Sequence, residues 1–525
     1  MKKRMWKLRG MLALGAIATA LTLIFPQVGF LEWLTMIPMI WAAICICKED
    51  QTSLWSAFQC GFLTGFCFYF ALYHWLVHLY PMDFVGMSPA ASVAVIAAGW
   101  LGLPILNAIV CGFVFLLFRL MHKSGIFGYV PLLRPFSFAA LWVAFEWCTT
   151  QTWMGVPWGR LALGQIEMKP MLGIAALFGS YGVTFLIVAV NALIAEIVHS
   201  PRQTVVCGIV AAVLFAGNLG IGRIWYHREP KAESTVKAAV LQGNIGSHEK
   251  WGEDSLDRTK TVYGDMTRAA VADGAELVIW PETAIPFVLN QNSSLRNWVA
   301  DLAEECRVTI LVGALYRDAG GKEYNVLYEV LPDGVISETV YAKRHLVPFG
   351  EYVPLREMFM TLIPPLAELS ALDDDLSAGR SSALFETEWG KLGSLICFDS
   401  IYETLTIRSV RDGAELMILS TNDSWFYDSA AVYQHEAQAQ LRAIESGRWF
   451  LRSANTGISS VITPKGDAVE TVAPLEEGYI VETVGLTSAR TLYSRIGNLF
   501  VWLCMAFSLV LAPVGYLLKR KKEQR

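Results

Sequence analysis

The chain has 525 residues, of which 54% are hydrophobic and only 17% are charged, and its mean hydropathy is +0.41. Soluble domains carry about 25% charged residues, so this composition excludes a disordered chain and a disulfide scaffold and argues against a purely soluble enzyme. A net charge of −5 is too small and of the wrong sign for a nucleic-acid-binding protein. The composition therefore predicts a membrane protein, or a membrane protein that carries a soluble domain.

Eight apolar stretches are long enough to be membrane spans, since a span needs about 20 mostly apolar residues. Seven of them crowd into the first 225 residues and one lies near the C-terminus: 11–27, 31–47, 55–80, 91–119, 135–152, 170–198, 204–224 and 496–518. Between the last two stretches charged residues become frequent and apolar runs shorten. We therefore expect a membrane domain with seven helices (1–225), a soluble domain (226–495), and an eighth helix with a basic tail (496–525).

Basic residues in short loops predict the orientation, because loops rich in Lys and Arg tend to stay in the cytoplasm. The N-terminus, the loops that hold Lys48, Arg119–Lys123 and Arg202, and the tail 519–525 are basic, whereas the opposite loops are nearly free of Lys and Arg. Both termini are therefore predicted to be cytoplasmic. The soluble region is then predicted to lie on the other face, which in a bacterium is the periplasm.

The ten cysteines predict neither a metal site nor a disulfide scaffold. Seven of them lie in apolar spans, where Cys behaves as a small hydrophobic residue, and Cys148 lies near the outer end of the fifth span. Only Cys306 and Cys397 lie in the soluble region. In an oxidising compartment these two could form a disulfide.

The soluble region alternates strand-like and helix-like segments. Strands are predicted at 236–245, 276–280, 309–315, 324–331, 335–343, 392–397, 416–420, 450–453 and 457–463, and helices at 253–273, 295–306, 402–412 and 432–447. Together with a hairpin signal at Pro332-Asp333-Gly334, the alternation predicts an α/β domain of about 270 residues with a mixed sheet.

Three side chains at predicted strand ends are candidates for chemistry. Glu282 follows strand 276–280, Lys343 closes strand 335–343, and Cys397 ends strand 392–397. Each also has an ordinary structural explanation: a solvated carboxylate, an exposed strand-end lysine and a buried core cysteine. The combination favours catalysis, because a thiolate nucleophile needs a base to take its proton and a cation to hold the oxyanion.

Other catalytic sets are less well supported by the sequence. It contains no metal-binding motif and no convincing serine-centred triad. His248, His345 and His435 have no nucleophile beside them in the sequence. His435 lies inside the predicted helix 432–447 and is interpreted as structural.

Several motifs carry a resemblance to a known family. Trp280-Pro-Glu282, the strand-end Lys343 and Cys397-Phe398-Asp399 together resemble the nitrilase superfamily. Over nearly its full length the chain is similar to the membrane-embedded apolipoprotein N-acyltransferase family, most specifically at 241–245, 280–283, 345–354, 422–426 and 452–457. The resemblance implies a multi-pass helical membrane domain with eight transmembrane helices and a periplasmic nitrilase-like domain, an αββα sandwich.

The resemblance also implies roles for individual residues. Glu282 is expected to be the general base, Lys343 the oxyanion stabiliser and Cys397 the acylated nucleophile. Glu351 and Asp399 are expected to be supporting carboxylates.

Three further positions match residues linked to substrate binding in this family: Trp251, Trp425 and Asn455. The chain departs from the family at Phe398-Asp399, where Tyr-Glu is usual, and at Asn455-Thr456-Gly457, where Asn-Asn-Gly is usual. These changes concern neighbours of the three catalytic candidates, so the expected reaction is unchanged.

The implied reaction is a ping-pong acyl transfer from a phospholipid, through a cysteine thioester, to the α-amino group of the N-terminal diacylglyceryl-cysteine of a lipoprotein. The expected partners are a phospholipid acyl donor, a diacylated apolipoprotein acceptor and the bilayer, but no nucleic acid. No cofactor and no metal is expected, because the acyl group arrives already as an ester.

Two alternatives stay open at this point. A membrane-tethered nitrilase or amidase would hydrolyse a C–N bond with the same three residues and with water as the second nucleophile. A non-catalytic transporter or scaffold with a periplasmic binding domain would need ionisable residues along a path through the membrane.

Overall fold

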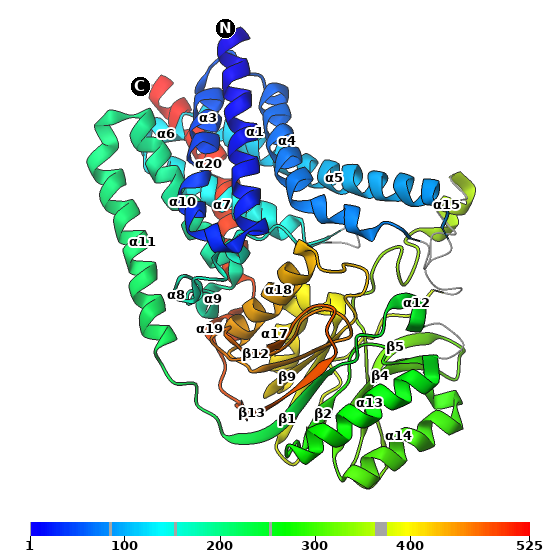
Figure 1. Cartoon of the computed structure of the whole chain (residues 1–525). Helices are drawn as coiled ribbons and strands as arrows, with labels where there is room; N and C mark the ends of the chain where they lie inside the picture. The colour runs from blue at the N-terminus through cyan, green and yellow to red at the C-terminus, as the bar shows by residue number, and fades with distance from the viewer. Residues whose placement is uncertain (1, 83–86, 152–154, 251–254, 363–374, 525) are drawn as a thin grey trace. The chain divides into compact units, whose positions relative to one another are not determined.

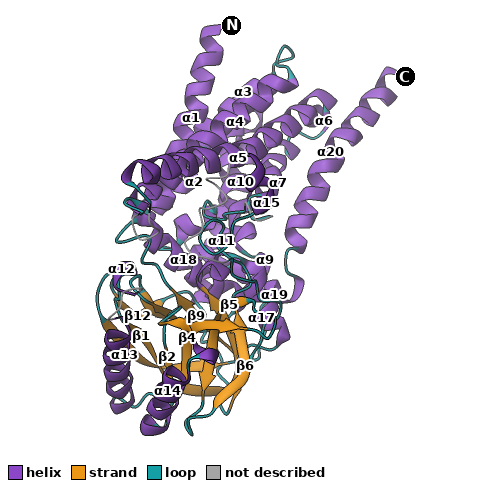
Figure 2. Ribbon diagram, turned by 90° about the vertical axis from the view of Figure 1, so that its right-hand side faces the viewer, coloured by secondary structure: helices purple, strands orange, loops and turns teal. Residues whose placement is uncertain are grey.

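The computed structural model describes residues 2–82, 87–151, 155–250, 255–362 and 375–524. The chain divides into two compact units (Figure 1). A helical unit comprises Met1–Val77, Val93–Arg228 and Ile496–Arg525, and a second unit comprises His78–Ser92 and Glu229–Arg495. All strands of the described residues belong to the second unit (Figure 2).

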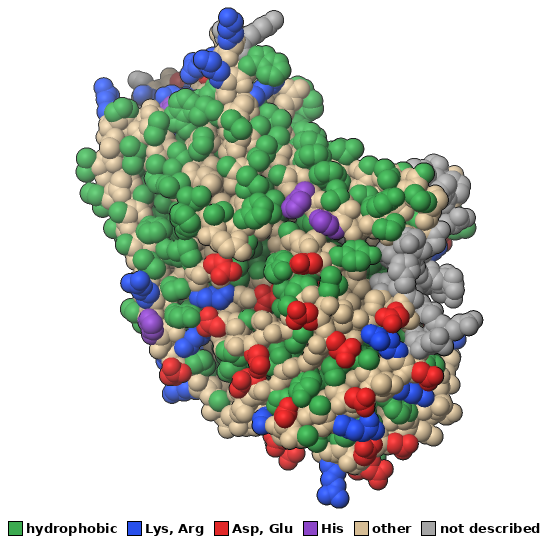
Figure 3. Space-filling model, in the orientation of Figure 1, with side chains coloured by type: hydrophobic (Ala, Val, Ile, Leu, Met, Phe, Trp, Pro, Cys, Tyr) green, Lys and Arg blue, Asp and Glu red, His purple; other side chains and the backbone are tan. Residues whose placement is uncertain are grey.

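The helical unit is built from long apolar helices joined by short helices and 3₁₀ turns. Its helices are α1 (Lys2–Ile24), α2 (Glu32–Thr35), α3 (Ile37–Lys48), α4 (Leu54–Leu72), α5 (Pro89–Ser124), α6 (Ile126–Tyr129), α7 (Leu133–Cys148), α8 (Lys169–Leu172), α9 (Ala175–Phe178), α10 (Ser180–His199), α11 (Thr204–Tyr226) and α20 (Leu499–Glu523). Hydrophobic side chains such as Leu14, Val205 and Ile224 are exposed on its surface, and Figure 3 shows how densely they cover one face. Such a surface suits a lipid environment, and the chain is a membrane protein.

Seven helical segments are long and apolar enough to cross a membrane, judged by length and composition over the described residues. They are Lys3–Ile24, Pro26–Lys48, Leu54–Leu79, Pro89–Ser124, Ser180–His199, Pro201–Tyr226 and Leu499–Glu523.

The predicted count of eight spans is not confirmed. The predicted span 135–152 corresponds to α7, whose 16 residues rise about 24 Å, less than the hydrocarbon core of about 30 Å. The predicted span 170–198 is divided among α8, α9 and α10, and Gly179 between the last two has a φ of +71°. Only α10 of these three is long enough to count as a span.

The second unit contains two β-sheets. Their strands run in the orders β13-β1-β2-β4-β5-β6, with β3 paired beside β4, and β12-β11-β10-β9-β8-β7. The strands are β1 (Ser234–Gln242), β2 (Leu277–Ile279), β3 (Ile285–Val288), β4 (Thr309–Arg317), β5 (Glu323–Val330), β6 (Ile336–Ala342), β7 (Phe385–Thr387), β8 (Gly390–Ile396), β9 (Leu416–Thr421), β10 (Phe450–Ala454), β11 (Ser459–Ile462), β12 (Ala468–Val472) and β13 (Gly478–Leu486).

The second unit also contains helices. They are α12 (Ser247–Lys250), α13 (Ser255–Ala272), α14 (Ser293–Cys306), α15 (Arg356–Leu362), α17 (Glu403–Asp412), α18 (Ala430–Ser446) and α19 (Leu492–Ile496), with a 3₁₀ turn at Cys397–Ile401. Apolar residues of both sheets, among them Val240, Ile279 and Ile418, form one core between the sheets. Separate cores lie under α13 and α14 and under α17 and α18. The layers are therefore αββα, as the family resemblance implied.

Each of the nine predicted strands is present, but four strands were not predicted: β3, β7, β12 and β13. β13 pairs antiparallel with β1 along its whole length, from Ser234↔Leu486 to Gln242↔Gly478. The disulfide considered between Cys306 and Cys397 is not formed, because both thiols are free.

Candidate active site

Glu282 and Lys343 meet at the ends of two strands of one sheet. Glu282 lies in the turn that follows β2, and Lys343 is the first residue after β6. Their side chains are buried, and Lys343 Nζ lies 2.9 Å from Glu282 Oε1. The turn fits closely because Gly313 on β4 has no side chain: a Cβ there would lie 2.1 Å from the Pro281 carbonyl oxygen.

Lys343 is shared between two carboxylates. Its Nζ also lies 2.9 Å from Glu351 Oε2, which in turn accepts a hydrogen bond of 2.8 Å from the backbone N–H of Val347. Asn325 Nδ2 on β5 donates to Glu282 Oε1 at 2.7 Å and to Glu351 Oε1 at 3.1 Å. Burial opposes the charge of Lys343, but the two carboxylates and Cys397 hold its pKa well above its usual range. The lysine is therefore a fixed cation.

Cys397 is the first residue of the 3₁₀ turn that directly follows β8. Its backbone has a φ of +47°, in the left-handed region that a residue with a side chain rarely adopts, and such strain is typical of functional sites. Burial and the charge of Glu282 raise the pKa of its thiol above the usual range, while Lys343 and Thr421 lower it. The resting thiol is therefore protonated at neutral pH, and a base is needed to make it a nucleophile.

Asp399 ties the Cys397 turn to the segment that carries Lys343. Its carboxylate accepts hydrogen bonds from the backbone N–H groups of His345 (2.7 Å) and Ile396 (3.2 Å) and from the hydroxyl of Tyr341 (2.8 Å). Burial raises the pKa of Asp399, while Arg344, Tyr341 and Lys343 oppose the rise. The expected supporting carboxylate is therefore placed where it fixes the two turns against each other.

A second group of polar side chains beside Cys397 was not predicted. Asp423, directly after β9, and His435 on α18 each offer an atom that lies, with Cys397 Sγ, in a cluster spanning at most 4.8 Å. His435 Nδ1 lies 2.8 Å from Asp423 Oδ1, and Arg452 Nη2 on β10 donates to Asp423 Oδ2 at 2.8 Å. Because the carboxylate is already engaged by His435 and by a guanidinium, a hydrogen-bond network describes this group better than a metal site.

Lys250 is a second buried lysine that the sequence analysis missed, because it stands in no recognised motif. Its Nζ donates to the Glu282 carbonyl oxygen at 3.1 Å and to Thr283 Oγ1 at 2.6 Å. Burial lowers the pKa of Lys250 to about 8, against the opposing charges of Glu282 and Cys397. Asp423 could have been identified from the sequence, since it lies in the segment 422–426 that carries part of the family resemblance. Nothing in the sequence connects it with His435.

The three predicted substrate-binding residues fare differently. Trp251 lies outside the described residues. Trp425 is half-buried in the turn after β9. Asn455 is buried, and its side chain bonds both the N–H (3.3 Å) and the carbonyl oxygen (2.7 Å) of Ile245. The Asn455 side chain thus joins the segment after β1 to the segment after β10.

The αββα layers, with a glutamate, a lysine and a cysteine at three strand ends, define the class of this unit. A model of the family described as carbon-nitrogen hydrolase matches residues 237–493, so the unit has the nitrilase fold. A second family model, the apolipoprotein N-acyltransferase N-terminal domain, matches residues 16–193. The chain belongs to the apolipoprotein N-acyltransferase family, and it is an acyltransferase.

Relatives match over nearly the whole chain. The apolipoprotein N-acyltransferase of Geobacter metallireducens is 31% identical over 96% of this chain and 95% of its own length. That of Gloeobacter violaceus is 32% identical over 97% of this chain and 94% of its own.

Solved structures resemble only part of the chain. Saccharomyces cerevisiae Nit3, a nitrilase superfamily member, is 18% identical over 51% of this chain and 95% of its own, with a TM-score of 0.39. The carbon-nitrogen hydrolase of Helicobacter pylori G27 is 18% identical over 52% of this chain and 94% of its own, with a TM-score of 0.37. The sequence matches, and not these likenesses, establish the family.

Proposed function

We propose that the chain transfers an acyl group from a phospholipid to the α-amino group of the N-terminal diacylglyceryl-cysteine of a lipoprotein, by a ping-pong reaction through a thioester on Cys397. The observation that carries the proposal is the arrangement of Lys343 between Glu282 and Glu351, together with the action of the Glu282 and Lys343 charges on the thiol of the strained Cys397 turn. A nucleophile, a base and a cation for the oxyanion are the groups that acyl transfer requires.

In the first half-reaction Glu282 takes the thiol proton of Cys397. Its Oε1 is occupied by Lys343 and Asn325, and among the described residues no hydrogen bond engages Oε2, which leaves that oxygen to accept the proton. Sγ then forms a bond to the ester carbonyl carbon, and Lys343 stabilises the oxyanion. The C–O bond of the ester breaks, Glu282 returns the proton to the leaving oxygen, and lysophospholipid departs.

In the second half-reaction the lipoprotein amine attacks the thioester. The reference pKa of an α-amino group is about 7.7–8.0, so a base is useful for removing its proton. Glu282 takes this proton, the N–C bond forms, the C–S bond breaks, and the proton passes to the thiolate of Cys397. The cycle closes without a nucleotide, because the acyl group enters as an ester.

The basic N-terminus and C-terminal tail support an orientation with both termini in the cytoplasm and residues 226–495 in the periplasm. Both substrates carry acyl chains, whose removal from a bilayer costs about 0.8 kcal/mol per CH₂. A membrane domain at 1–225 and a last helix at 496–525 therefore keep the catalytic domain at the surface where its substrates reside.

The test is detection of a covalent acyl adduct on Cys397. The purified full chain is incubated with phospholipid labelled in its acyl chains, and the adduct is located by intact and peptide mass spectrometry. We expect one acyl group on Cys397, released by hydroxylamine and transferred to a synthetic diacylated lipopeptide, and no adduct in Cys397→Ala. Labelled free fatty acid instead of acylated lipopeptide would favour the amidase alternative, and full transfer by Cys397→Ala would disprove the thioester route.

A further inference from the structure

A chain of buried hydrogen bonds runs from Arg452 to the backbone of the Cys397 turn. Arg452 Nη2 donates to Asp423 Oδ2 at 2.8 Å, and Asp423 Oδ1 lies 2.8 Å from His435 Nδ1. His435 Nε2 lies 3.0 Å from Ser400 Oγ, whose hydroxyl donates to the Cys397 carbonyl oxygen at 2.8 Å. The five residues therefore link β10 and α18 to the residue expected to be the nucleophile.

The neighbours of His435 in this chain are mostly hydrogen-bond acceptors. The Ser400 hydroxyl donates to the Cys397 carbonyl oxygen, which leaves Ser400 Oγ able to accept from His435 Nε2. Nε2 also lies 3.3 Å from that carbonyl oxygen, which can only accept. Nδ1 lies 2.8 Å from Asp423 Oδ1, an acceptor, and 3.3 Å from Arg452 Nη2, which can only donate. A ring with a proton on each nitrogen would donate to all three acceptors.

A proton on each ring nitrogen of His435 would change the net charge beside the Cys397 thiol. With an imidazolium, the buried set of Arg452, Asp423 and His435 carries a net charge of +1, because two cations share one carboxylate. Cys397 Sγ lies within 4.8 Å of a nitrogen of His435 and an oxygen of Asp423. An opposite charge at such a distance stabilises an ionised group.

We propose that His435 is a positioning residue for acyl transfer: its imidazolium holds the Cys397 turn through Ser400 and stabilises the thiolate of Cys397. This inference rests on the proposed role of Cys397 as the nucleophile. The charged groups that act on Cys397 are Glu282 after β2, Lys343 after β6, Lys250 on α12 and Asp423 after β9. A nitrogen of His435 on α18 lies within 4.8 Å of the thiol. Glu282 and Asp423 are carboxylates, and their negative charges disfavour the thiolate. The positive charge of a doubly protonated His435 offsets the negative charge of Asp423.

The experiment measures the pH at which Cys397 becomes reactive. The full chain in detergent is alkylated with iodoacetamide over a range of pH, and modification of the Cys397 peptide is followed by mass spectrometry. In His435→Gln we expect the midpoint of the pH profile to rise by about one to three pH units. Ser400→Ala removes an acceptor of His435 Nε2 and a hydrogen bond to the turn, so its midpoint should rise as well. His227→Gln, at an exposed position, is the control and should keep the wild-type midpoint.

An unchanged midpoint in a folded His435→Gln protein overturns the proposal, because a purely structural histidine would behave in that way. Alkylation needs no acyl donor, so this result is independent of whether the proposed acyl transfer occurs. If His435→Gln does not fold, the protonation of His435 is measured directly by NMR on the wild-type chain labelled with ¹⁵N-histidine. The ring signals that shift on alkylation of Cys397 belong to His435, and at pH 7 both nitrogens should carry protons; a neutral ring overturns the proposal.

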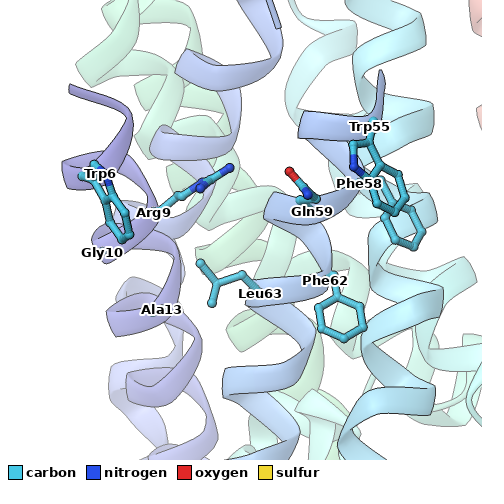
Figure 4. A pocket seen from close by; sticks show the side chains of 9 residues that line it. All are labelled: Trp6, Arg9, Gly10, Ala13, Trp55, Phe58, Gln59, Phe62 and Leu63. Atoms are coloured by element: carbon cyan, nitrogen blue, oxygen red, sulfur yellow. The ribbon is translucent and has the colours of Figure 1, made fainter. Parts of the chain in front are cut away.

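A different observation, in the helical unit, carries a second inference. A groove of about 680 Å³ separates the N-terminal halves of α1 and α4 (Figure 4). Arg9 on α1 and Gln59 on α4 point toward one another across it, and Trp6 and Trp55 stand nearer the helix ends. Below Arg9 and Gln59 in Figure 4 the groove is lined by apolar residues, among them Leu63.

Arg9 is a cation in largely apolar surroundings. Among the described residues it forms no ion pair with a carboxylate, and it lies close to the buried thiol of Cys60, a weak acceptor. Arg4 on the same helix, by contrast, pairs with Glu49 at 2.8 Å. A guanidinium inside a membrane-crossing helix is costly unless it is paired, and a phosphate is a fitting partner because it accepts two parallel hydrogen bonds.

We infer that this groove binds one glycerophospholipid. Its phosphate is held by Arg9 and Gln59, the rings of Trp6 and Trp55 lie at headgroup level, and an acyl chain runs along the apolar part of the groove. Under the orientation proposed above, these helix ends lie in the cytoplasmic leaflet. The lipid is then a bound structural lipid and is distinct from the acyl donor of the periplasmic leaflet.

The test is retention of dioleoylphosphatidylglycerol by the full chain in native mass spectrometry. We expect one tightly held lipid in the wild type and about tenfold weaker retention in Arg9→Gln, because the phosphate loses its charge-assisted hydrogen bonds to the guanidinium. Arg4→Gln, on the same helix, should retain the lipid as the wild type does. Equal retention by Arg9→Gln, or displacement of the lipid by millimolar inorganic phosphate, would overturn the inference.

Discussion

The helical unit and the αββα unit use buried charge in different ways. In the helical unit Arg134 and Glu196 form a one-to-one pair at 2.7 Å, which joins α7 to α10. In the αββα unit one ammonium, Lys343, is shared between Glu282 and Glu351 at 2.9 Å each. In a one-to-one pair the two charges neutralise each other, and the pair holds the two helices together. Because one ammonium serves two carboxylates, Glu282 keeps an oxygen that no described residue engages, and the same residue types can then act as a base.

Glu282→Gln tests the catalytic side of this comparison and has the largest expected effect. The amide keeps a carbonyl oxygen for Lys343 but cannot take the thiol proton, so formation of the Cys397 thioester should slow by about 10²–10⁴-fold. The rate is measured by mass spectrometry after mixing with labelled phospholipid. A loss of less than about threefold would show that Glu282 is not the base.

Arg134→Met tests the structural side. It leaves the Glu196 carboxylate buried without its partner and should lower the free energy of unfolding by about 3–5 kcal/mol. The double variant Arg134→Met/Glu196→Met should recover most of that loss, because no buried charge remains. Alkylation of Cys397 should be unchanged in the folded single variant. A large change in Cys397 reactivity would mean that the Arg134–Glu196 pair also affects the catalytic residues, and does not have a purely structural role.

Lys250→Met tests whether a buried charge in the αββα unit makes the free energy of unfolding depend on pH. The pKa of Lys250 is about 8 in the folded chain and near 10.5 when unfolded, so between these values the unfolded chain binds more protons and stability rises with pH. Below about pH 8 the wild type carries the full cost of the buried charge. From pH 7 to 10.5 it should gain about 3 kcal/mol relative to Lys250→Met.

The check for Lys250 is the free energy of unfolding of the full chain in detergent at several pH values. The exposed Lys322 supplies the control, and Lys322→Met should follow the wild-type pH dependence. If the free energy of unfolding depended on pH in the same way for the wild type and Lys250→Met, Lys250 would not carry a buried charge.

Asp399→Asn has the smallest expected effect. The amide keeps one acceptor oxygen but turns a donor toward the N–H groups of Ile396 and His345, which should cost about 1–3 kcal/mol of stability. Asp399→Glu, which restores the usual family residue, should retain activity within about tenfold of the wild type. Both are measured by thermal unfolding and thioester formation, and a complete loss of activity in Asp399→Glu would show that the shorter side chain is required here.

Much of the αββα unit was predictable from local patterns. The strand ends at Glu282, Lys343 and Cys397 were recognised because apolar runs stop there, and alternating strands and helices indicated the α/β class. The span count was not predictable in the same way. Hydropathy could not show that α7 has only 16 helical residues or that the chain breaks at Gly179, because those depend on how the segments pack.

The sequence by itself determined the apolar stretches, the class of the second unit and the three residue types that acyl transfer needs, because each depends on near neighbours along the chain. Only the tertiary structure decided which groups surround them. Asp423, His435 and Arg452 come from three separate elements, and they become a network only when β9, α18 and β10 are packed together. Hydrogen bonds and charges act over a few ångströms in space, and distance along the chain does not reveal that proximity.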